Sequence, residues 1–135
     1  QCIPLSCEIE YEISQMPSEQ DRKDFLETLG AKESGLDKLV KASYRLLNLS
    51  TFFTCGADEC RAWTFQNGML APECAGIIHS DFQKGFIKAE IYDFDELKKY
   101  GSELAVKEAG KLRSEGKEYV MKDGDVVFFR FNVTK

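Results

Sequence analysis

The stretch "ECAGIIHSDFQKGFIKAE", residues 73–90, decides the fold. Pro72, just before it, suits the first position of a helix over 71–85, because proline is tolerated in the first helical turn. From Phe86 onward, apolar and charged side chains alternate, as they do along a half-buried strand. The stretch therefore predicts a helix that leads directly into a strand. One side of this strand is predicted to be apolar and carries Ile87, Ala89 and Ile91. The other side carries Lys88 and Glu90.

Strand patterns lie on both sides of this unit. "STFFTC" (50–55) and "CRAWTFQ" (60–66) predict two strands joined by a tight connection, "GADE" (56–59). The second strand is followed by the turn signal "NG". Downstream, 93–116 predicts one or two helices, and "KEYVM" and "DVVFFRFNV" flank "KDG" as a closing hairpin over 117–133.

The first third of the chain has a different, helical texture. Ser18 and Ser34 are good N-caps for two helices, and Gly30 is placed to end the first of them. Before these helices, "CIPLS" (2–6) is short and apolar and predicts a buried strand. "CEIEYEIS" (7–14) either continues that strand or opens a helix, since its period fits both. A strand at this place has no visible partner in the sequence.

The order strand, strand, helix, strand, helical connection, strand, strand predicts an α+β domain with a helix packed across a sheet. Its ββαβ start is the order of the ubiquitin-like β-grasp. No internal repeat or low-complexity tract interrupts the pattern.

Composition limits the partners. The chain is 43% apolar and 30% charged with a net charge of −5, which is typical of a globular protein and not of a polyanion binder acting through bulk charge. No apolar run approaches the ~20 residues of a membrane span. The start lacks a basic head and an apolar signal core, so we expect a cytoplasmic protein. It also lacks an initiator Met, which indicates a processed chain or a fragment.

Catalytic and metal-binding patterns are absent from the sequence. No phosphate-binding glycine loop or metalloprotease motif is present, so the chain alone is not expected to be an enzyme. Five cysteines and one histidine fit neither a zinc site nor a disulfide framework, and we expect reduced thiols. The spacing of Cys55 and Cys60 is not specific to a redox or metal site. Cys74 and His79 would lie on different sides of one helix, too badly placed for proton transfer.

The single histidine, His79, allows two interpretations. One is structural: a residue at a helix C-terminus that caps backbone carbonyls or pairs with Asp81. The other is functional: a polar contact to RNA or protein from an exposed helix end.

Three segments together resemble the TGS domain that closes the YchF-type, or Obg-like, P-loop ATPases. They are "FFTCGADECRAWTFQNG" (52–68), "APECAGIIHSDFQKGFIKAEIYDFDEL" (71–97) and "EAGKLRSEGKEYVMKDGDVVFFRFNV" (108–133). Within them, RAWT, IHSDFxKGFIxAE and EAGKxRxEGKxY are specific to that family. "IPLSCEIEYEI" (3–13) and the two following helices resemble the end of the preceding nucleotide-binding domain.

The resemblance implies two parts. Residues 1–47 would be the C-terminal strand and helices of an incomplete P-loop NTPase domain, and 48–135 a TGS domain. Ser6, Cys7 and Glu8 match the family's Ser-Ala-x loop beside the nucleotide base, with Cys7 in place of the usual Ala. The phosphate-binding and metal-binding motifs would lie upstream, so ATP or GTP and Mg²⁺ belong to the full-length parent. No catalytic residue and no metal ligand is expected in this chain.

The family is associated with ribosome and RNA binding, which implies a binding and regulatory module, without specificity for DNA. Trp63 and Phe65 would then be either stacking faces or core residues. The alternative is a free-standing ubiquitin-like adaptor that acts through protein contacts and has no nucleotide role. The contact residues that the resemblance suggests are Arg61, His79, Lys84, Lys88 and Arg113.

Overall fold

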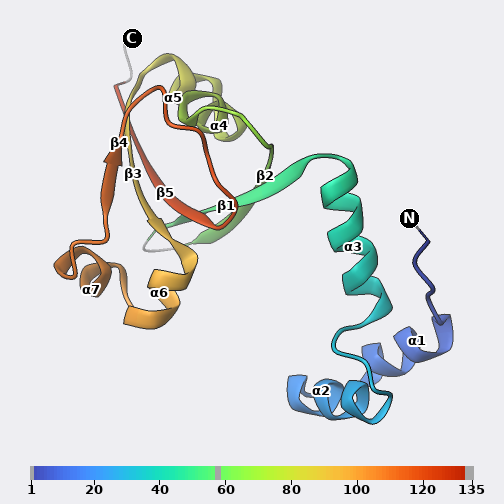
Figure 1. Ribbon diagram of the computed structural model, residues 1–135. Coiled ribbons are helices and arrows are strands. Elements are labelled where there is room, and N and C mark those ends of the chain that lie inside the picture. The colour runs from blue at the N-terminus through green and yellow to red at the C-terminus, as the bar shows by residue number, and fades with distance from the viewer. Residues whose placement is uncertain (1, 57–58, 133–135) are drawn as a thin grey trace. The chain divides into compact units, whose positions relative to one another are not determined.

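The computed structural model describes residues 2–56 and 59–132. The chain divides into two compact units, Gln1–Leu47 and Asn48–Lys135 (Figure 1). The longest helix of the described residues has 12 residues, too few for the ~20 that a bilayer crossing needs.

The first unit contains three helices, each begun by a serine. They are α1 (Cys7–Gln15), α2 (Glu19–Thr28) and α3 (Gly35–Leu46). The hydroxyls of Ser6, Ser18 and Ser34 each accept a hydrogen bond from the backbone N–H three residues later. Such a bond satisfies one of the N–H groups that a helix start leaves without a partner. The two predicted caps are confirmed, and Gly30 follows α2 with a φ of 67°.

The strand predicted at residues 2–6 is wrong. None of the described residues of the first unit forms a strand, and residues 7–14, which the sequence left open, belong to helix α1. The physical reason is that a strand exists through hydrogen bonds to a neighbouring strand. Helix α1, in contrast, satisfies its own backbone once Ser6 caps it.

The second unit is a five-stranded mixed sheet with helices. The strands are β1 (Leu49–Cys55), β2 (Cys60–Gln66), β3 (Phe86–Asp93), β4 (Arg113–Glu115) and β5 (Asp125–Phe131), in the order β2-β1-β5-β3-β4. Strands β1 and β5 are parallel and the other neighbours are antiparallel. The helices are α4 (Ala71–Ile78), α5 (Ser80–Lys84), α6 (Phe94–Tyr100) and α7 (Glu103–Glu108).

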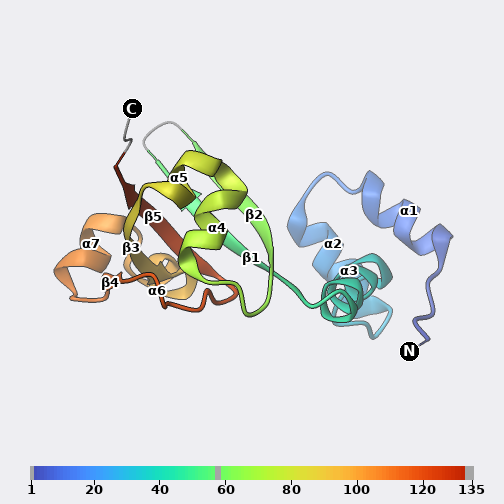
Figure 2. The same ribbon diagram turned by 90° about the horizontal axis from the view of Figure 1, so that it is seen from above.

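Side-chain alternation along the central strands fills two hydrophobic clusters. On β5, Val127 and Phe129 belong to the larger cluster with Phe52 and the α4 residues Cys74 and Ala75. Their neighbour on β5, Val126, belongs to a smaller cluster with Tyr92 and with Val106 of α7. Since successive side chains of a strand point to opposite faces, the two clusters lie on opposite faces of the sheet. Figure 2 shows α4 and α5 together over one face.

The α+β class and the strands predicted at 50–55, 60–66 and 86–92 are confirmed, and β5 lies within the strand predicted at 125–133. Of the connection predicted at 56–59, residues 57 and 58 lie outside the described residues. The assignment to the ubiquitin-like β-grasp stays a prediction.

Two expectations around the central helix are wrong. The helix predicted over 71–85 is divided at His79, whose backbone is extended (φ −160°, ψ 139°), into α4 and α5. Ile87 is 57% exposed, not part of the apolar face. The pairing of β3 with β5 is irregular between Phe86 and Lys88, so Phe86 faces the core in its place.

The closing hairpin over 117–133 is also wrong. Strand β5 already has β1 on one side and β3 on the other, so neither edge is left for residues 117–121. In that segment Val120 forms an isolated bridge with Leu70. The remaining strand is β4, inside the region predicted as helical, and it pairs with β3.

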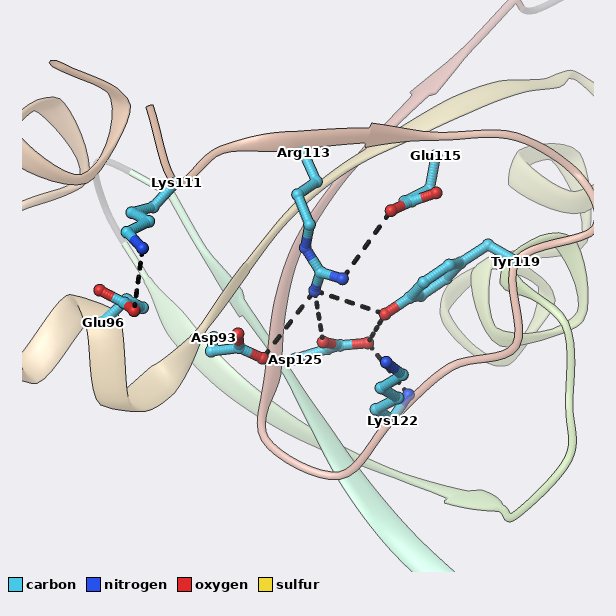
Figure 3. A network of polar contacts seen from close by, with 8 residues as sticks. All are labelled: Asp93, Glu96, Lys111, Arg113, Glu115, Tyr119, Lys122 and Asp125. Atoms are coloured by element: carbon cyan, nitrogen blue, oxygen red, sulfur yellow. Dashed lines mark hydrogen bonds and ion pairs between the residues drawn. The ribbon is translucent and has the colours of Figure 1, made fainter. Parts of the chain in front are cut away.

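A buried aspartate organises the segment that was expected to form that hairpin (Figure 3). Asp125, the first residue of β5, is 0% exposed. Its Oδ2 accepts hydrogen bonds from the Tyr119 hydroxyl (2.9 Å) and from the backbone N–H of Lys122 (3.0 Å). A terminal nitrogen of Arg113 lies 3.5 Å from Oδ1. These contacts hold the loop between β4 and β5 against the sheet.

A close backbone approach joins α5 to the end of β5. The N–H of Asn132 donates to the carbonyl of Gly85 (2.8 Å), and the N–H of Gly85 donates to the carbonyl of Asp81 (2.9 Å). A Cβ atom at Gly85 would collide with the carbonyl oxygen of Asn132. Glycine is therefore required here for space.

Replacing Asp125 by Asn should change how the free energy of unfolding depends on pH. Burial raises the pKa of Asp125 despite its hydrogen bonds from Lys122 and Tyr119 and the charge of Arg113. The folded chain therefore holds this proton more tightly than the unfolded chain. The wild type should lose stability relative to D125N as the pH rises from about 4, the ordinary aspartate pKa, through the raised folded value. Urea unfolding at a series of pH values measures this difference.

The exposed Asp95, replaced by Asn, controls for the change in net charge. If the advantage of the wild type over D125N grew with pH, the Arg113 ion pair would outweigh the burial of the carboxylate, contrary to the prediction.

Replacing Gly85 by Ala should destabilise the second unit by about 2 kcal/mol or more, because the added methyl group can be accommodated only by moving backbone. Gly116→Ala is the matched control, since a Cβ there meets no atom within 4 Å. Equal urea midpoints for the two variants would show that the approach of Asn132 is not tight.

Candidate functional site

His79 forms the junction between α4 and α5. Its Nδ1 accepts a hydrogen bond from the backbone N–H of Asp81 (3.2 Å), so His79 caps the start of α5. Nδ1 also lies 3.6 Å from an oxygen of the Asp81 carboxylate. Because Nδ1 is the acceptor, a neutral ring carries its proton on Nε2. The predicted pairing with Asp81 is confirmed, whereas the alternative, capping of carbonyls, is wrong in direction, because the ring accepts from an amide. The side chain is 60% exposed and remains accessible.

Lys84 lies in the last turn of the same short helix and is exposed. Phe82, between the two, stacks on Phe131 of β5 with ring centroids 3.8 Å apart, which fixes α5 to the sheet. His79 and Lys84 are thus presented from one anchored element.

Arg61 lies on β2, which is an edge strand. Its guanidinium carbon is 4.5 Å from the centroid of the Trp63 ring, a cation–π contact. The Trp63 Nε1–H donates to the Thr54 hydroxyl (2.9 Å), and its ring stacks on Phe52. Trp63 is half-buried, and its ring packs against the guanidinium group of Arg61. Phe65 is 2% exposed and is a core residue, so the stacking role considered for it is wrong.

Lys88 lies on the opposite face of the sheet, in a short charged row. Its Nζ is 2.9 Å from the Glu90 carboxylate, and Arg130 donates two hydrogen bonds to the other oxygen of Glu90 (3.0 and 3.2 Å). The bonds from Lys88 and then Arg130 lower the pKa of Glu90. Arg130 also covers Phe128, which is 47% exposed, at 4.3 Å from the ring centroid.

Arg113 is engaged by carboxylates (Figure 3). Besides Asp125, its terminal nitrogens lie 3.9 Å from Asp93 and 3.8 Å from Glu115. Its guanidinium carbon is 5.7 Å from the centroid of the Tyr119 ring. The charge of Arg113 is therefore largely compensated within the fold.

The structure brings His79 and Lys84 together on α5 and separates the other three candidates. Arg61 shares the sheet face of Trp63 and Phe52, Lys88 lies on the reverse face, and Arg113 belongs to the Asp125 network. The role of each as a contact residue stays a prediction.

The candidates for nucleophilic chemistry are unsuited to it. Cys74 is fully buried in the larger cluster, and burial raises the pKa of its thiol to about 12. Its thiolate is therefore scarce at neutral pH. The break at His79 also removes the single helix on which a pairing with Cys74 was considered.

Ser6, Cys7 and Glu8 form the cap and first residues of α1 in the first unit, and all three are exposed. Nearby, the Glu10 carboxylate accepts a hydrogen bond from the backbone N–H of Gly35 (2.8 Å), which ties α1 to the start of α3. An open pocket of about 370 Å³ lies between these helices and is lined by Leu5, Ser6, Ile9 and Leu26, among others.

These residues do not by themselves fit a nucleotide with its metal ion. The pocket wall combines aliphatic side chains with Glu10, Glu33 and Lys38, and the glycine-rich loop that cradles phosphates is not in the sequence. Among residues 2–56 and 59–132, no group of three or more His, Cys, Asp or Glu is placed to hold a metal. Glu8, Glu10 and Glu12 would share one side of a strand, but they lie on helix α1.

Several contributing residues were missed by sequence reasoning. Asp125 was read as the start of a strand, although a carboxylate beside the run "VVFF" is unusual enough to suggest a buried acceptor. The sequence signal for Phe128 and Arg130 was their alternation with the core residues of β5, which places both on the other face of that strand. Nothing in the local sequence connects Glu10 with Gly35.

The chain matches known proteins along most of its length. Residues 49–132 match the YchF-GTPase_C family, described as a protein of unknown function (DUF933). The chain is 58% identical over 131 residues to the ribosome-binding ATPase YchF of Bacillus subtilis, covering 97% of this chain and 36% of that protein. It is 47% identical over 130 residues to Obg-like ATPase 1 of Gallus gallus, covering 96% of this chain and 32% of that protein.

Solved structures agree with these matches. The YchF GTPase of Schizosaccharomyces pombe superimposes with a TM-score of 0.80 at 39% identity, covering 96% of this chain and 34% of that one. A GTP-binding protein from Pyrococcus horikoshii shares the fold, with a TM-score of 0.61 at 16% identity.

The chain spans about a third of the length of the relatives that it matches. The family match covers more than half of the chain, and the aligned relatives extend it to nearly all of it. This chain therefore belongs to the YchF-GTPase_C family and is homologous to the corresponding part of the YchF and Obg-like ATPases.

Proposed function

We propose that this chain is the ribosome-contacting module of a YchF-type protein that hydrolyses ATP or GTP, with Mg²⁺, through a nucleotide-binding domain upstream. One observation carries the proposal: a relative named as ribosome-binding aligns with 97% of this chain at 58% identity. In this proposal the second unit is a TGS domain of the β-grasp type. The first unit ends the nucleotide-binding domain, with Ser6, Cys7 and Glu8 beside the nucleotide base, and the protein works in the cytoplasm.

The exposed cations favour a small contact with ribosomal RNA. Lys84 is exposed at the end of α5, where it can neutralise a phosphate. Arg61 is held over Trp63, so its orientation costs little additional entropy on binding. Lys88 and Arg113 are weaker candidates, since Glu90 compensates the first and Asp125, Asp93 and Glu115 the second.

His79 would support the same contact in two ways. It caps α5 and so positions Lys84, and its exposed ring edge can donate a hydrogen bond from Nε2. A substitution that keeps the cap but removes the ring distinguishes these two roles. The sequence alone left both open.

The first prediction concerns salt. We expect the chain to co-sediment with Bacillus subtilis ribosomes and its association constant to fall as KCl increases, with a logarithmic slope of about −2 for two or three phosphate contacts. Because the net charge is −5, binding through bulk charge is not expected. Binding that did not change with salt would point to a protein partner on the apolar side chains Phe128 and Ile87, and so to the adaptor alternative.

The second prediction compares variants. Lys84→Ala should weaken ribosome binding about three- to tenfold and reduce the salt slope by about 1, as expected for one lost phosphate contact. Lys23→Ala is the matched control, because Lys23 is an exposed lysine of the first unit paired with Glu19. If both variants bound like the wild type, α5 would not be part of the contact.

His79→Asn should retain most of the stability, since Asn is a good N-cap, whereas His79→Ala should lose about 1 kcal/mol. If only the cap matters, H79N binds ribosomes like the wild type. If the ring also contacts RNA, H79N binds more weakly than the wild type, and H79A, which loses both the cap and the ring, binds at least as weakly as H79N. Urea unfolding and co-sedimentation of the same samples decide between the two roles.

A further inference from the structure

The far end of the β1–β2 hairpin brings two cysteines face to face. Cys55 is the last residue of β1, Cys60 is the first of β2, and the two are direct partners in the antiparallel register. Direct partners have their side chains on the same face of the sheet. Both thiols are free.

The hydrogen-bond pattern of the β1–β2 ladder shows how close the side chains of this pair lie. At one end of the ladder, the N–H of Asn67 donates to the carbonyl of Asn48 (2.9 Å), and at the other the N–H of Gly56 donates to that of Glu59 (2.8 Å). In an antiparallel ladder, hydrogen-bonded and non-hydrogen-bonded pairs alternate. Counting from either end, Cys55 and Cys60 form a non-hydrogen-bonded pair.

Non-hydrogen-bonded pairs bring side chains closest together. Their Cα atoms lie about 4.5 Å apart, inside the range of roughly 4.4–6.8 Å that disulfides span. The sulfur atoms can therefore be joined without moving either strand far.

The two thiols differ in exposure. Cys60 is exposed, whereas Cys55 is half-buried and packs against the cluster of Tyr92, Val106 and Val126. Burial, and next the hydrogen bond with Cys60, raises the pKa of Cys55 to about 11. An oxidant therefore reaches Cys60 first, and Cys55 is held beside it to react second.

We propose that Cys55 and Cys60 are a redox modification site, which hydrogen peroxide converts into a disulfide that crosses the β1–β2 hairpin and which a dithiol reductant converts back. Cys60 sulfur attacks the peroxide, the O–O bond breaks, and a sulfenic acid and one water form. Cys55 sulfur then attacks the sulfenic sulfur, the S–O bond breaks, and the disulfide and a second water form. Two thiols lose two electrons and two protons, and one hydrogen peroxide is reduced.

The site is distinct from the remaining cysteines. Cys74 is enclosed in the larger cluster, and Cys2 and Cys7 belong to the first unit, outside the β1–β2 ladder. The inference rests on strand register and is independent of the proposed ribosome contact.

The test treats the whole folded chain with hydrogen peroxide, blocks the remaining thiols, and digests it with a protease that cleaves after glutamate. Glu59 lies between the two cysteines, so the fragments that carry them stay joined only through a disulfide. We expect the joined fragments as the main product, their loss on addition of dithiothreitol, and their absence in Cys60→Ser.

A control variant tests whether disulfide formation depends on the strand register. The double substitution Cys55→Ser with Thr54→Cys moves the thiol by one residue, which places it on the opposite face of β1. It should form the link at least about tenfold less readily in glutathione buffers, and unfolding the wild type in urea should reduce the link similarly. Equal formation in the variant or in urea would overturn the proposal, as would Cys2–Cys7 or intermolecular products as the main outcome.

Discussion

The second unit depends on β5, a strand with neighbours on both edges and apolar clusters on both faces. One cluster contains its residues Val127 and Phe129, and the other contains Val126. Strands β1 and β3 form hydrogen bonds with the backbone of β5, one on each edge. Asp125 begins this strand as a buried carboxylate that gathers Tyr119, Lys122 and Arg113. Strands β1 and β3, and the loop that carries Tyr119 and Lys122, take their positions from it.

Two of the cations considered as contact residues, Arg113 and Lys88, are compensated by carboxylates within the fold. Arg113 is directed inward to Asp125, and Glu90 is shared by Lys88 and Arg130 across two strands. Such pairs mainly orient side chains, because exposed ion pairs add little stability. An acidic chain that carries a local cationic contact must leave some cations uncompensated, and Lys84 and Arg61 are the exposed examples that we propose.

The extent to which the sequence predicted the fold depends on how local each signal is. Ser18, Ser34 and the alternation of β1 and β2 act within a few residues, and those elements were predicted correctly. The helix is divided at His79 because its ring accepts a hydrogen bond from the Asp81 amide. The 117–133 hairpin does not form because β1 occupies one edge of β5. The candidate site shows the same limit: residue types suggested four cations and a histidine, but only the register separates Arg61 from Lys88 by the thickness of the sheet.

The parallel pairing of β1 with β5 joins the first strand of the second unit to its last. During synthesis, β1 leaves the ribosome before its partner has been translated. The edge of β1 that pairs with β5, and the side of Phe52 that packs against Phe129, then remain open until β5 emerges, since non-local pairings close late. The hairpin with β2 can form early and protect the other edge of β1. The sheet of this unit is therefore completed only after β5, the last of its strands along the chain, has been synthesised.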